Sequence, residues 1–285
     1  MAAARVARVT EASPAPRRTR VPRATTVVAT TRVSPHLVRV VLGGPALEGF
    51  DPGAHADSYV KLVLPAPGGE EGATVLRTYT VRAFDAEARE LVLDVVVHGD
   101  EGVAGPWAAS ARPGDAVDVL GPGGDYAPDP AAAWHLLVGD DSALPAVAVA
   151  LERLPAGVRA LVFLEVESPD EQQPLPTDAD ATVVWVHRSE RGDGVPGQAL
   201  VDAVTGAALP GGDVHAFVHG EAGAVRQVRR HLRSALGVPP ERLSASGYWR
   251  LGRTDEGWRA DKPEWKRSVE DDERALSTGR TAPGR

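Results

Sequence analysis

Residues 134–154 read WHLLVGDDSALPAVAVALERL, an apolar run followed directly by a Gly-Asp-Asp-Ser turn and an amphipathic segment. The run 134–138 is short, apolar and bounded by glycine, as expected for a buried strand. The segment 142–154 has helical spacing, with apolar residues at i, i+3, i+7 and i+10 counted from Leu144. A buried strand that turns directly into a helix is the unit of a parallel α/β sheet, and nucleotides bind at such turns.

Downstream, apolar strands continue to alternate with helical segments. We predict strands at 160–166, 182–187 and 214–218, and helices at 198–209 and 222–236. The second of these helices is predicted to turn Arg226, Arg229, Arg230 and Arg233 outward to solvent. Three prolines make 168–180 a loop and not a crossover helix. The alternation predicts a doubly wound parallel α/β domain over residues 131–260, of the kind that binds nucleotides.

Upstream, the pattern has a period of two and frequent turns. Six short strands are predicted at 25–31, 36–42, 58–64, 75–82, 90–98 and 115–120, with Leu91, Leu93, Val95 and Val97 on one face. No long helix separates them, so residues 23–130 are predicted to form a six-stranded antiparallel barrel. We expect residues 1–22 to be a disordered Arg-rich head. Residues 261–285 are highly charged and are expected to form a tail or an exposed helix, with the acidic run 270–273 as a solvated face.

Composition excludes several functional classes. The chain of 285 residues has no cysteine, which removes disulfides, thiolate zinc sites, Cys-held iron–sulfur clusters and Cys nucleophiles. Its formal net charge is −8, whereas nucleic-acid binders are more often basic, so we expect no nucleic-acid partner. It lacks both a membrane-spanning apolar run and a signal-peptide pattern. We therefore expect a cytoplasmic protein without membrane contact, and a monomer.

Four motifs carry the chemistry, and the first is Arg77-Thr78-Tyr79-Thr80. A tyrosine can cover a planar ring, threonines can reach its polar edges, and an arginine pairs with phosphate. Strand alternation places Arg77, Tyr79 and Val81 on one face, and Thr78, Thr80 and Arg82 on the other. The alternative is an amphipathic strand of good β-formers without a ligand.

The second motif is a glycine-rich loop that leads into a short helix. Its named positions are His98, Gly99, Gly102, Ala104, Gly105 and Trp107. Such a loop can present backbone N–H groups to a pyrophosphate. The alternative is a ligand-free turn between a strand and a helix.

The third and fourth motifs lie at strand ends of the α/β domain. Gly139-Asp140-Asp141-Ser142-Ala143 departs from the Gly-x-Gly-x-x-Gly fingerprint, and the alternative is that Asp141 or Ser142 is an ordinary N-cap of the helix. Tyr248 and Trp249 precede Arg250 and Arg253, so this segment could stack on a ring and hold an anion. Its alternative is a buried edge strand.

No metal site or activated nucleophile is predicted. The eight histidines show no metal-binding spacing, and the chain has neither a Gly-x-Ser-x-Gly elbow nor a Walker loop. His135, His187 and His215 lie in or beside apolar strands and are expected to be hydrogen-bonded core residues.

Together, the four motifs resemble those of the siderophore-interacting protein family of FAD-dependent ferric-siderophore reductases, which are ferredoxin-reductase-like flavoproteins. The resemblance covers about residues 24–258 and includes the segments 184–188 and 247–252. It implies FAD held mainly by the barrel and NADPH or NADH, or in some members ferredoxin, as the electron donor.

The resemblance also implies roles for individual residues. Arg77, Thr78, Tyr79 and Thr80 would hold the flavin ring and ribityl chain, and His98, Gly99, Gly102, Ala104, Gly105 and Trp107 would surround the pyrophosphate. Asp140, Asp141, Ser142, Ala143, Tyr248 and Trp249 would face the nicotinamide nucleotide and the flavin. The family's Gly-Pro-Ala-Ser loop here reads Gly102-Val-Ala-Gly105, so the serine hydroxyl that donates to phosphate is missing. Losing a hydrogen bond to a charged group weakens binding by about 1.5–3 kcal/mol.

Such a reaction needs no acid, base or nucleophile from the protein, because the flavin takes up hydride and passes on single electrons. An anionic ferric siderophore would need nearby cations, and Lys61, Arg250 and Arg253 are the candidates. Lys61 is notable in a chain with 28 Arg and 3 Lys. Two other interpretations stay open: a flavin reductase or reductase component for a partner protein, and a non-catalytic siderophore-binding module. Arg188 is a candidate contact for the 2′-phosphate of NADPH.

Overall fold

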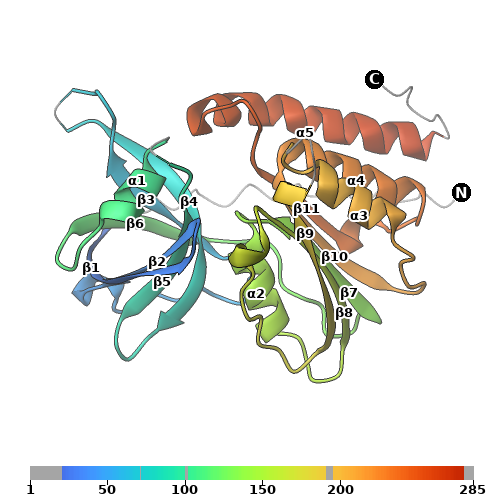
Figure 1. The fold of residues 1–285 in the computed structure, drawn as a ribbon, viewed down its shortest axis with the longest axis horizontal. Helices are drawn as coiled ribbons and strands as arrows, with labels where there is room; N and C mark the ends of the chain where they lie inside the picture. The colour runs from blue at the N-terminus through green and yellow to red at the C-terminus, as the bar shows by residue number, and fades with distance from the viewer. Residues whose placement is uncertain (1–20, 71, 100–101, 191–194, 279–285) are drawn as a thin grey trace, which may run out of the picture.

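The computed structural model describes residues 21–70, 72–99, 102–190 and 195–278. An antiparallel barrel lies beside a parallel sheet that has helices on both faces (Figure 1). Most of the Arg-rich head expected over 1–22 lies outside the described residues.

The barrel contains the six predicted strands. They are β1 (Arg23–Ser34), β2 (Leu37–Gly43), β3 (Tyr59–Pro65), β4 (Thr74–Asp85), β5 (Glu90–Val96) and β6 (Ala116–Gly123), and they close in the order β1-β2-β5-β4-β3-β6. A short helix, α1 (Ala104–Ser110), and a 3-10 turn, η1 (Pro45–Leu47), complete this part. The predicted inward face of β5 is confirmed, since Leu91, Leu93 and Val95 are fully buried and Val97 is nearly so. These aliphatic side chains belong to the core that fills the barrel.

The parallel sheet has the strand order β11-β10-β7-β8-β9. Its strands are β7 (Trp134–Asp140), β8 (Arg159–Val166), β9 (Asp180–His187), β10 (Val214–Glu221) and β11 (Leu243–Trp249), and its helices are α2 (Leu144–Glu152), α3 (Gln198–Gly206) and α4 (Ala222–Ser234). Short 3-10 turns are η2 (Pro169–Glu171), η3 (Arg188–Glu190) and η4 (Pro240–Arg242). Between β8 and β9 the chain forms only η2 and loop, as the prolines predicted.

Three predicted details of the sheet can be compared with the structure. The doubly wound arrangement is confirmed: α2 packs in one core and α3 and α4 in the other. The segment that contains Tyr248 and Trp249 ends an edge strand, β11, which was the alternative considered for that motif. Of the three histidines, His187 and His215 are hydrogen-bonded. His135 is fully buried, but neither of its ring nitrogens has a hydrogen-bond partner among the described residues.

The two halves share one core and several polar contacts. Ala56 and Tyr126 pack with α2 and with Leu137 of β7. Arg82 of β4 makes a bidentate pair with Glu152 of α2, at 2.6 and 3.0 Å. In η2, buried Glu171 accepts hydrogen bonds from the Ser34 hydroxyl and the His36 backbone, so it fastens the sheet to the β1–β2 hairpin.

The charged C-terminal segment forms a long helix, α5 (Asp255–Ser277), so the boundary expected at 260/261 falls inside a helix. The Thr254 side chain caps it by accepting from the backbone N–H of Gly257 (3.1 Å). Trp258 and Trp265 are buried against the sheet core, and Nε1 of Trp265 donates to the Ala222 carbonyl (2.9 Å). The helix lies over α4, with its first turn toward the barrel (Figure 1).

Docking of α5 corrects two expectations about charge. Arg226 pairs with Asp272, while Arg229 and Arg233 both pair with Glu273. Three of the four arginines predicted to face solvent therefore face α5, and only Arg230 is exposed. Likewise the acidic run 270–273 is not simply a solvated face, because Asp272 is buried. Each helix alone has a charged surface, and the two surfaces complement each other only after docking.

This seam can be tested with Asp272→Asn. Asp272 accepts two hydrogen bonds from Arg226, at 2.7 and 2.9 Å, and the arginine is partly exposed. We expect the free energy of unfolding to fall by about 1–2 kcal/mol, measured by urea denaturation. The matched control is Asp271→Asn, since Asp271 makes only an exposed pair with Arg274. An equal effect of both variants would contradict the assigned seam.

Candidate functional site

The first motif lies on β4, beside a lysine of β3. The strands pair antiparallel with Lys61 opposite Thr78 and Tyr59 opposite Thr80. Nζ of Lys61 donates to the Thr78 hydroxyl (2.8 Å). The expected proximity of Lys61 to the motif strand is therefore confirmed, and it follows from strand register.

Arg77 is held by the start of α5. Its guanidinium contacts Glu256 (2.7 Å) and Asp255 (3.2 Å), and the Arg259 guanidinium donates to the Leu76 carbonyl. Burial raises the pKa of Asp255, although Arg259 and Arg77 act to lower it. An anion at Arg77 must therefore share the guanidinium with these carboxylates.

Tyr79 and Thr80 follow the alternation only in part. Tyr79 packs on the barrel core, as expected for the face it shares with Val81. Thr80, on the opposite face, is also buried, and α2 of the second half packs against β4. Burial raises the pKa of Tyr248, while Thr80 acts to lower it. Tyr248 packs against the core that contains Ala56 and Tyr126, where barrel and sheet join. A register shift between Val81 and Ala83 marks a bulge in the strand just beyond this point.

The glycine-rich loop leaves room for a ligand. Gly99 and Gly102 have φ of 52° and 78°, and a Cβ on either would meet no atom within 4 Å. Ala104 is buried and Trp107 packs on the barrel core, so both anchor the loop from inside. At Gly105 a Cβ would make only ordinary contacts at 3.5 Å or more. A serine would therefore fit at this position, and packing does not explain why the chain has glycine there. Residues 100–101 lie outside the described residues.

At the sheet edge, Asp140 is committed to the chain itself. Oδ1 accepts from the backbone N–H (3.0 Å) and hydroxyl (2.5 Å) of Ser142, and Oδ2 accepts from Glu221 N–H (2.7 Å) and Trp249 Nε1 (2.8 Å). Neither Asp140 nor the Trp249 indole N–H is therefore directed at a ligand. Ala143 is fully buried and serves in packing. The Asp140 carboxylate, which was expected to face a ligand, is instead buried and links the ends of the strands.

Tyr248 belongs to a hydrogen-bonded chain of side chains. Its hydroxyl bonds Nδ1 of His219 (3.0 Å), and Nε2 of His219 bonds the Ser244 hydroxyl (2.9 Å). His219 also stacks on Phe217, with ring centroids 3.8 Å apart. The sequence did not single out His219, because a histidine in an apolar strand carries no distinguishing pattern.

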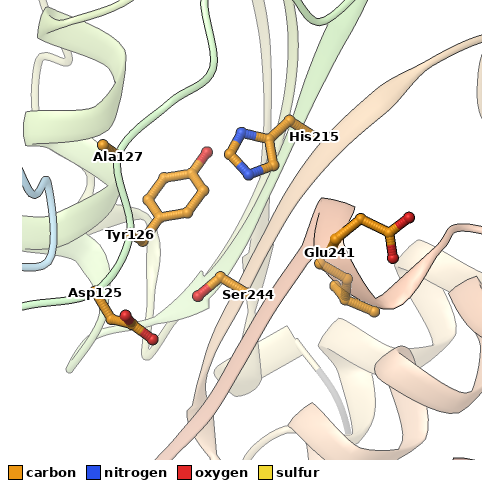
Figure 2. A pocket seen from close by; sticks show the side chains of 7 residues that line it. Asp125, Tyr126, Ala127, His215, Glu241 and Ser244 are labelled. Carbon is orange, nitrogen blue, oxygen red and sulfur yellow. The ribbon is translucent and has the colours of Figure 1, made fainter. Parts of the chain in front are cut away.

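Ser244 also lines a pocket of about 210 Å³ at the amino ends of β10 and β11, opposite the edge that carries Asp140. Figure 2 shows Tyr126 directed at His215, with Asp125 and Glu241 on either side. The Tyr126 hydroxyl is buried and has no hydrogen-bond partner among the described residues. Of the residues that line this pocket, only His215 was named from the sequence, as a core residue and not as part of a site.

The three candidate substrate cations gather around the start of α5. Arg253 pairs with Asp261 (2.7 Å), and Arg250 is exposed and pairs with no described carboxylate. A fourth cation, Lys262, donates to the Gly247 carbonyl (2.9 Å). Burial lowers the pKa of Lys262, and the charges of Lys266 and Lys61 act in the same direction. Two features of the sequence could have placed Lys262 on a docked helix: the capping residue Thr254 and the spacing of the tryptophans of α5.

A barrel whose polar motif strand meets the carboxyl edge of a parallel sheet defines a two-part, nucleotide-handling class of protein. Family comparison agrees: the model described as "Siderophore-interacting FAD-binding domain" matches residues 26–75 and 69–126, and "Siderophore-interacting protein" matches residues 132–252. The chain belongs to the siderophore-interacting protein family.

Three relatives illustrate the range of similarity. An uncharacterized protein of Mycobacterium tuberculosis is 45% identical over 85% of this chain and 94% of its own length. The ferric vibriobactin reductase ViuB of Vibrio cholerae is 32% identical, covering 81% of this chain and 90% of its own length. The crystal structure of the siderophore-interacting protein SipS from Aeromonas hydrophila superposes with a TM-score of 0.77 at 33% identity, over 87% of this chain and 99% of that one.

The residues present fit a flavin nucleotide. Gly99 and Gly102 have no Cβ, and the space that a Cβ would occupy at each of them is open. A pyrophosphate could therefore lie close to the backbone of this loop. Tyr79 offers an aromatic surface and Thr78 an exposed hydroxyl beside Lys61. Among the described residues no carboxylate and imidazole cluster suits a metal ion, and no helix is long and apolar enough to cross a membrane.

The buried His219 predicts a pH dependence of stability. Burial, together with a smaller effect of the Lys262 charge, lowers its pKa to about 3. Since the unfolded chain takes up this proton near pH 6.5, stability is present above that pH and is lost as pH falls toward 3. At pH 5 the loss is about 2 kcal/mol. His135, whose burial lowers its pKa to about 4, acts in the same direction.

Urea unfolding between pH 7 and pH 5 measures this effect, with His219→Gln expected to reduce the slope. Tyr248→Phe is the matched control, because it removes a hydrogen bond of His219 but keeps the imidazole, so it should retain the slope. A His219→Gln slope equal to that of the unaltered protein would contradict the assignment.

Proposed function

We propose that this protein is an FAD-dependent reductase that passes electrons from a nicotinamide dinucleotide to a ferric siderophore. The observation that carries the proposal is the attachment of β4 to α2, the helix that follows the turn at residues 139–142: α2 packs against β4, and Arg82 of β4 makes a bidentate pair with Glu152 of α2. It joins the strand suited to a flavin with the sheet edge suited to a nucleotide. The similarity to a ferric vibriobactin reductase supports the same reaction class.

The proposed roles of the residues are binding and orientation. Bound FAD supplies the redox chemistry, because it accepts two electrons as hydride and releases them singly. Thr78, Tyr79 and Thr80 orient the ring, while the backbone at Gly99, Gly102 and Gly105 holds the pyrophosphate. Tyr248, half-buried where barrel and sheet join, shields the junction from water, and Ser142 lies in the turn proposed to bind the nucleotide. In the overall reaction one NAD(P)H and two ferric ions give NAD(P)⁺, one proton and two ferrous ions.

Reduction explains the release of iron. Catecholate and hydroxamate oxygens are hard ligands that hold ferric iron tightly and ferrous iron less well. The ferric complex of a tris-catecholate is anionic, whereas the chain has a formal net charge of −8. We propose that Lys61, Arg250 and Arg253 form the local cationic surface, with Lys262 behind them.

The test is a visible spectrum of the purified protein, followed anaerobically. Flavin absorption that bleaches with a nicotinamide dinucleotide and returns with a ferric siderophore is expected. Return with free flavin or a partner protein but not with ferric siderophore would favour a flavin reductase or a reductase component. A colourless protein that takes up no added FAD would favour a siderophore-binding module.

Charge steering predicts the effect of Lys61→Glu. Reversing a charge beside the acceptor site should raise the KM for an anionic ferric siderophore at least about tenfold relative to that for an uncharged small acceptor. Steady-state kinetics with both acceptors measure the ratio. Arg159→Glu is the matched control, since this exposed arginine begins β8 at the opposite sheet edge. An equal change for both acceptors would reject steering by Lys61.

A further inference from the structure

Arg188 lies at the sheet edge where a dinucleotide is expected. It directly follows β9, while Asp141 follows β7 and Glu167 follows β8, and these strands are neighbours in the order β7-β8-β9. Their carboxyl ends therefore meet at one edge. In open parallel sheets ligands bind outside the carboxyl ends of the strands.

The Arg188 side chain is already surrounded by carboxylates. Its nitrogens lie 2.5 Å from Asp141 Oδ2, 3.1 Å from Glu167 Oε2 and 3.5 Å from Glu165 Oε1, and only 8% of the side chain is exposed. One positive charge thus faces three carboxylates. Although burial acts to lower the pKa of Arg188, these carboxylates raise it above its usual value, so the guanidinium stays charged and paired.

The three carboxylates have different surroundings. Glu165 is fully buried and accepts from the backbone N–H groups of Gly197 (2.6 Å) and Leu200 (3.0 Å) at the start of α3, so it is a structural cap. Asp141 is mostly buried, and burial raises its pKa to about 6 while Arg188 lowers it. Glu167 is 46% exposed and stands at the end of the second strand of the sheet sequence. Among these three, Glu167 is the most accessible to a ligand.

His98, at the start of the glycine-rich loop, lies near this edge of the sheet. Its ring centroid is 6.1 Å from that of His36, and His36 lines a small pocket together with Asp141. Burial lowers the pKa of His98, and the charge of Arg188 acts in the same direction, while Glu167 acts to raise it. A dinucleotide at this edge would lie next to the cluster and not at a distance from it.

We infer that the site selects a nicotinamide dinucleotide without a 2′-phosphate, so that NADH is the preferred donor. This inference rests on the proposed function. An acidic side chain after the second strand accepts a hydrogen bond from the ribose 2′-hydroxyl, and the same carboxylate repels a 2′-phosphate. Arg188, the residue that could have bound that phosphate, is neutralised by Asp141 and Glu167. Glu167 is the specificity-determining residue.

The test compares NADH with NADPH on the full-length, FAD-loaded protein. The unaltered protein should show a higher kcat/KM for NADH. By isothermal titration it should bind 5′-AMP more tightly than adenosine 2′,5′-bisphosphate, a readout that needs no turnover. Glu167→Gln removes one carboxylate from Arg188, and the NADPH-to-NADH ratio of kcat/KM should then rise about tenfold or more, the effect of a hydrogen bond to a charged group.

The matched control is Glu190→Gln. Glu190 lies in η3 at the same edge and bonds His187 (3.0 Å), but it makes no ion pair with Arg188. It should leave the ratio unchanged, although its charge change is the same. Equal or better use of NADPH by the unaltered protein, or equal shifts in both variants, would overturn the inference. If neither dinucleotide reduces the flavin and neither adenylate binds, the nicotinamide donor of the proposed function fails, and this inference fails with it.

Discussion

The buried carboxylate of Asp140 is the constraint on which the arrangement of the site depends. It accepts four hydrogen bonds, from Ser142 at the turn after β7, from Glu221 at the end of β10 and from Trp249 at the end of β11. A buried carboxylate without such donors would cost several kcal/mol. The constraint extends to Gly220, where a Cβ would lie 2.6 Å from Oδ2 of Asp140. Three strand ends are therefore held in one relation, and Tyr248, next to Trp249, is placed against the barrel.

Around this brace, charge pairing positions the remaining parts. Arg82 with Glu152 and Glu171 with Ser34 and His36 join barrel to sheet, and Arg226 with Asp272 docks α5 on α4. The docked helix in turn brings Asp255, Arg259 and Lys262 to the motif strand and its neighbours. In an acidic chain, the cations near the proposed substrate site are thus gathered from β3, the turn after β11 and α5. None of these three segments supplies all of these cations by itself.

Local patterns predicted much of the fold. Period-two alternation located the six barrel strands, and helical spacing located α2, α3 and α4 to within a few residues at most ends. The prolines of 168–180 correctly excluded a crossover helix, because a proline both removes an amide donor and clashes with the preceding turn. The sequence also predicted that the strand of Lys61 lies near the motif strand, whereas the register that places Lys61 opposite Thr78 is set by the structure. The site residues of the glycine-rich loop remain assignments by family resemblance, supported by the open space at Gly99 and Gly102.

Long-range partners were beyond the reach of those patterns. Asp140 and Trp249 are 109 residues apart, and Arg188 and Asp141 are 47 apart. No local spacing in the sequence therefore shows that the two side chains of each pair bond to one another. The same holds for the arginine face of α4, which the sequence predicted to be exposed to solvent and which α5 covers in the structure. Alternation, turn chemistry and apolar spacing depend on residues that are close together in the sequence, so the sequence alone predicts them. Which charges remain available to a ligand depends on neighbours in space, and folding alone sets those.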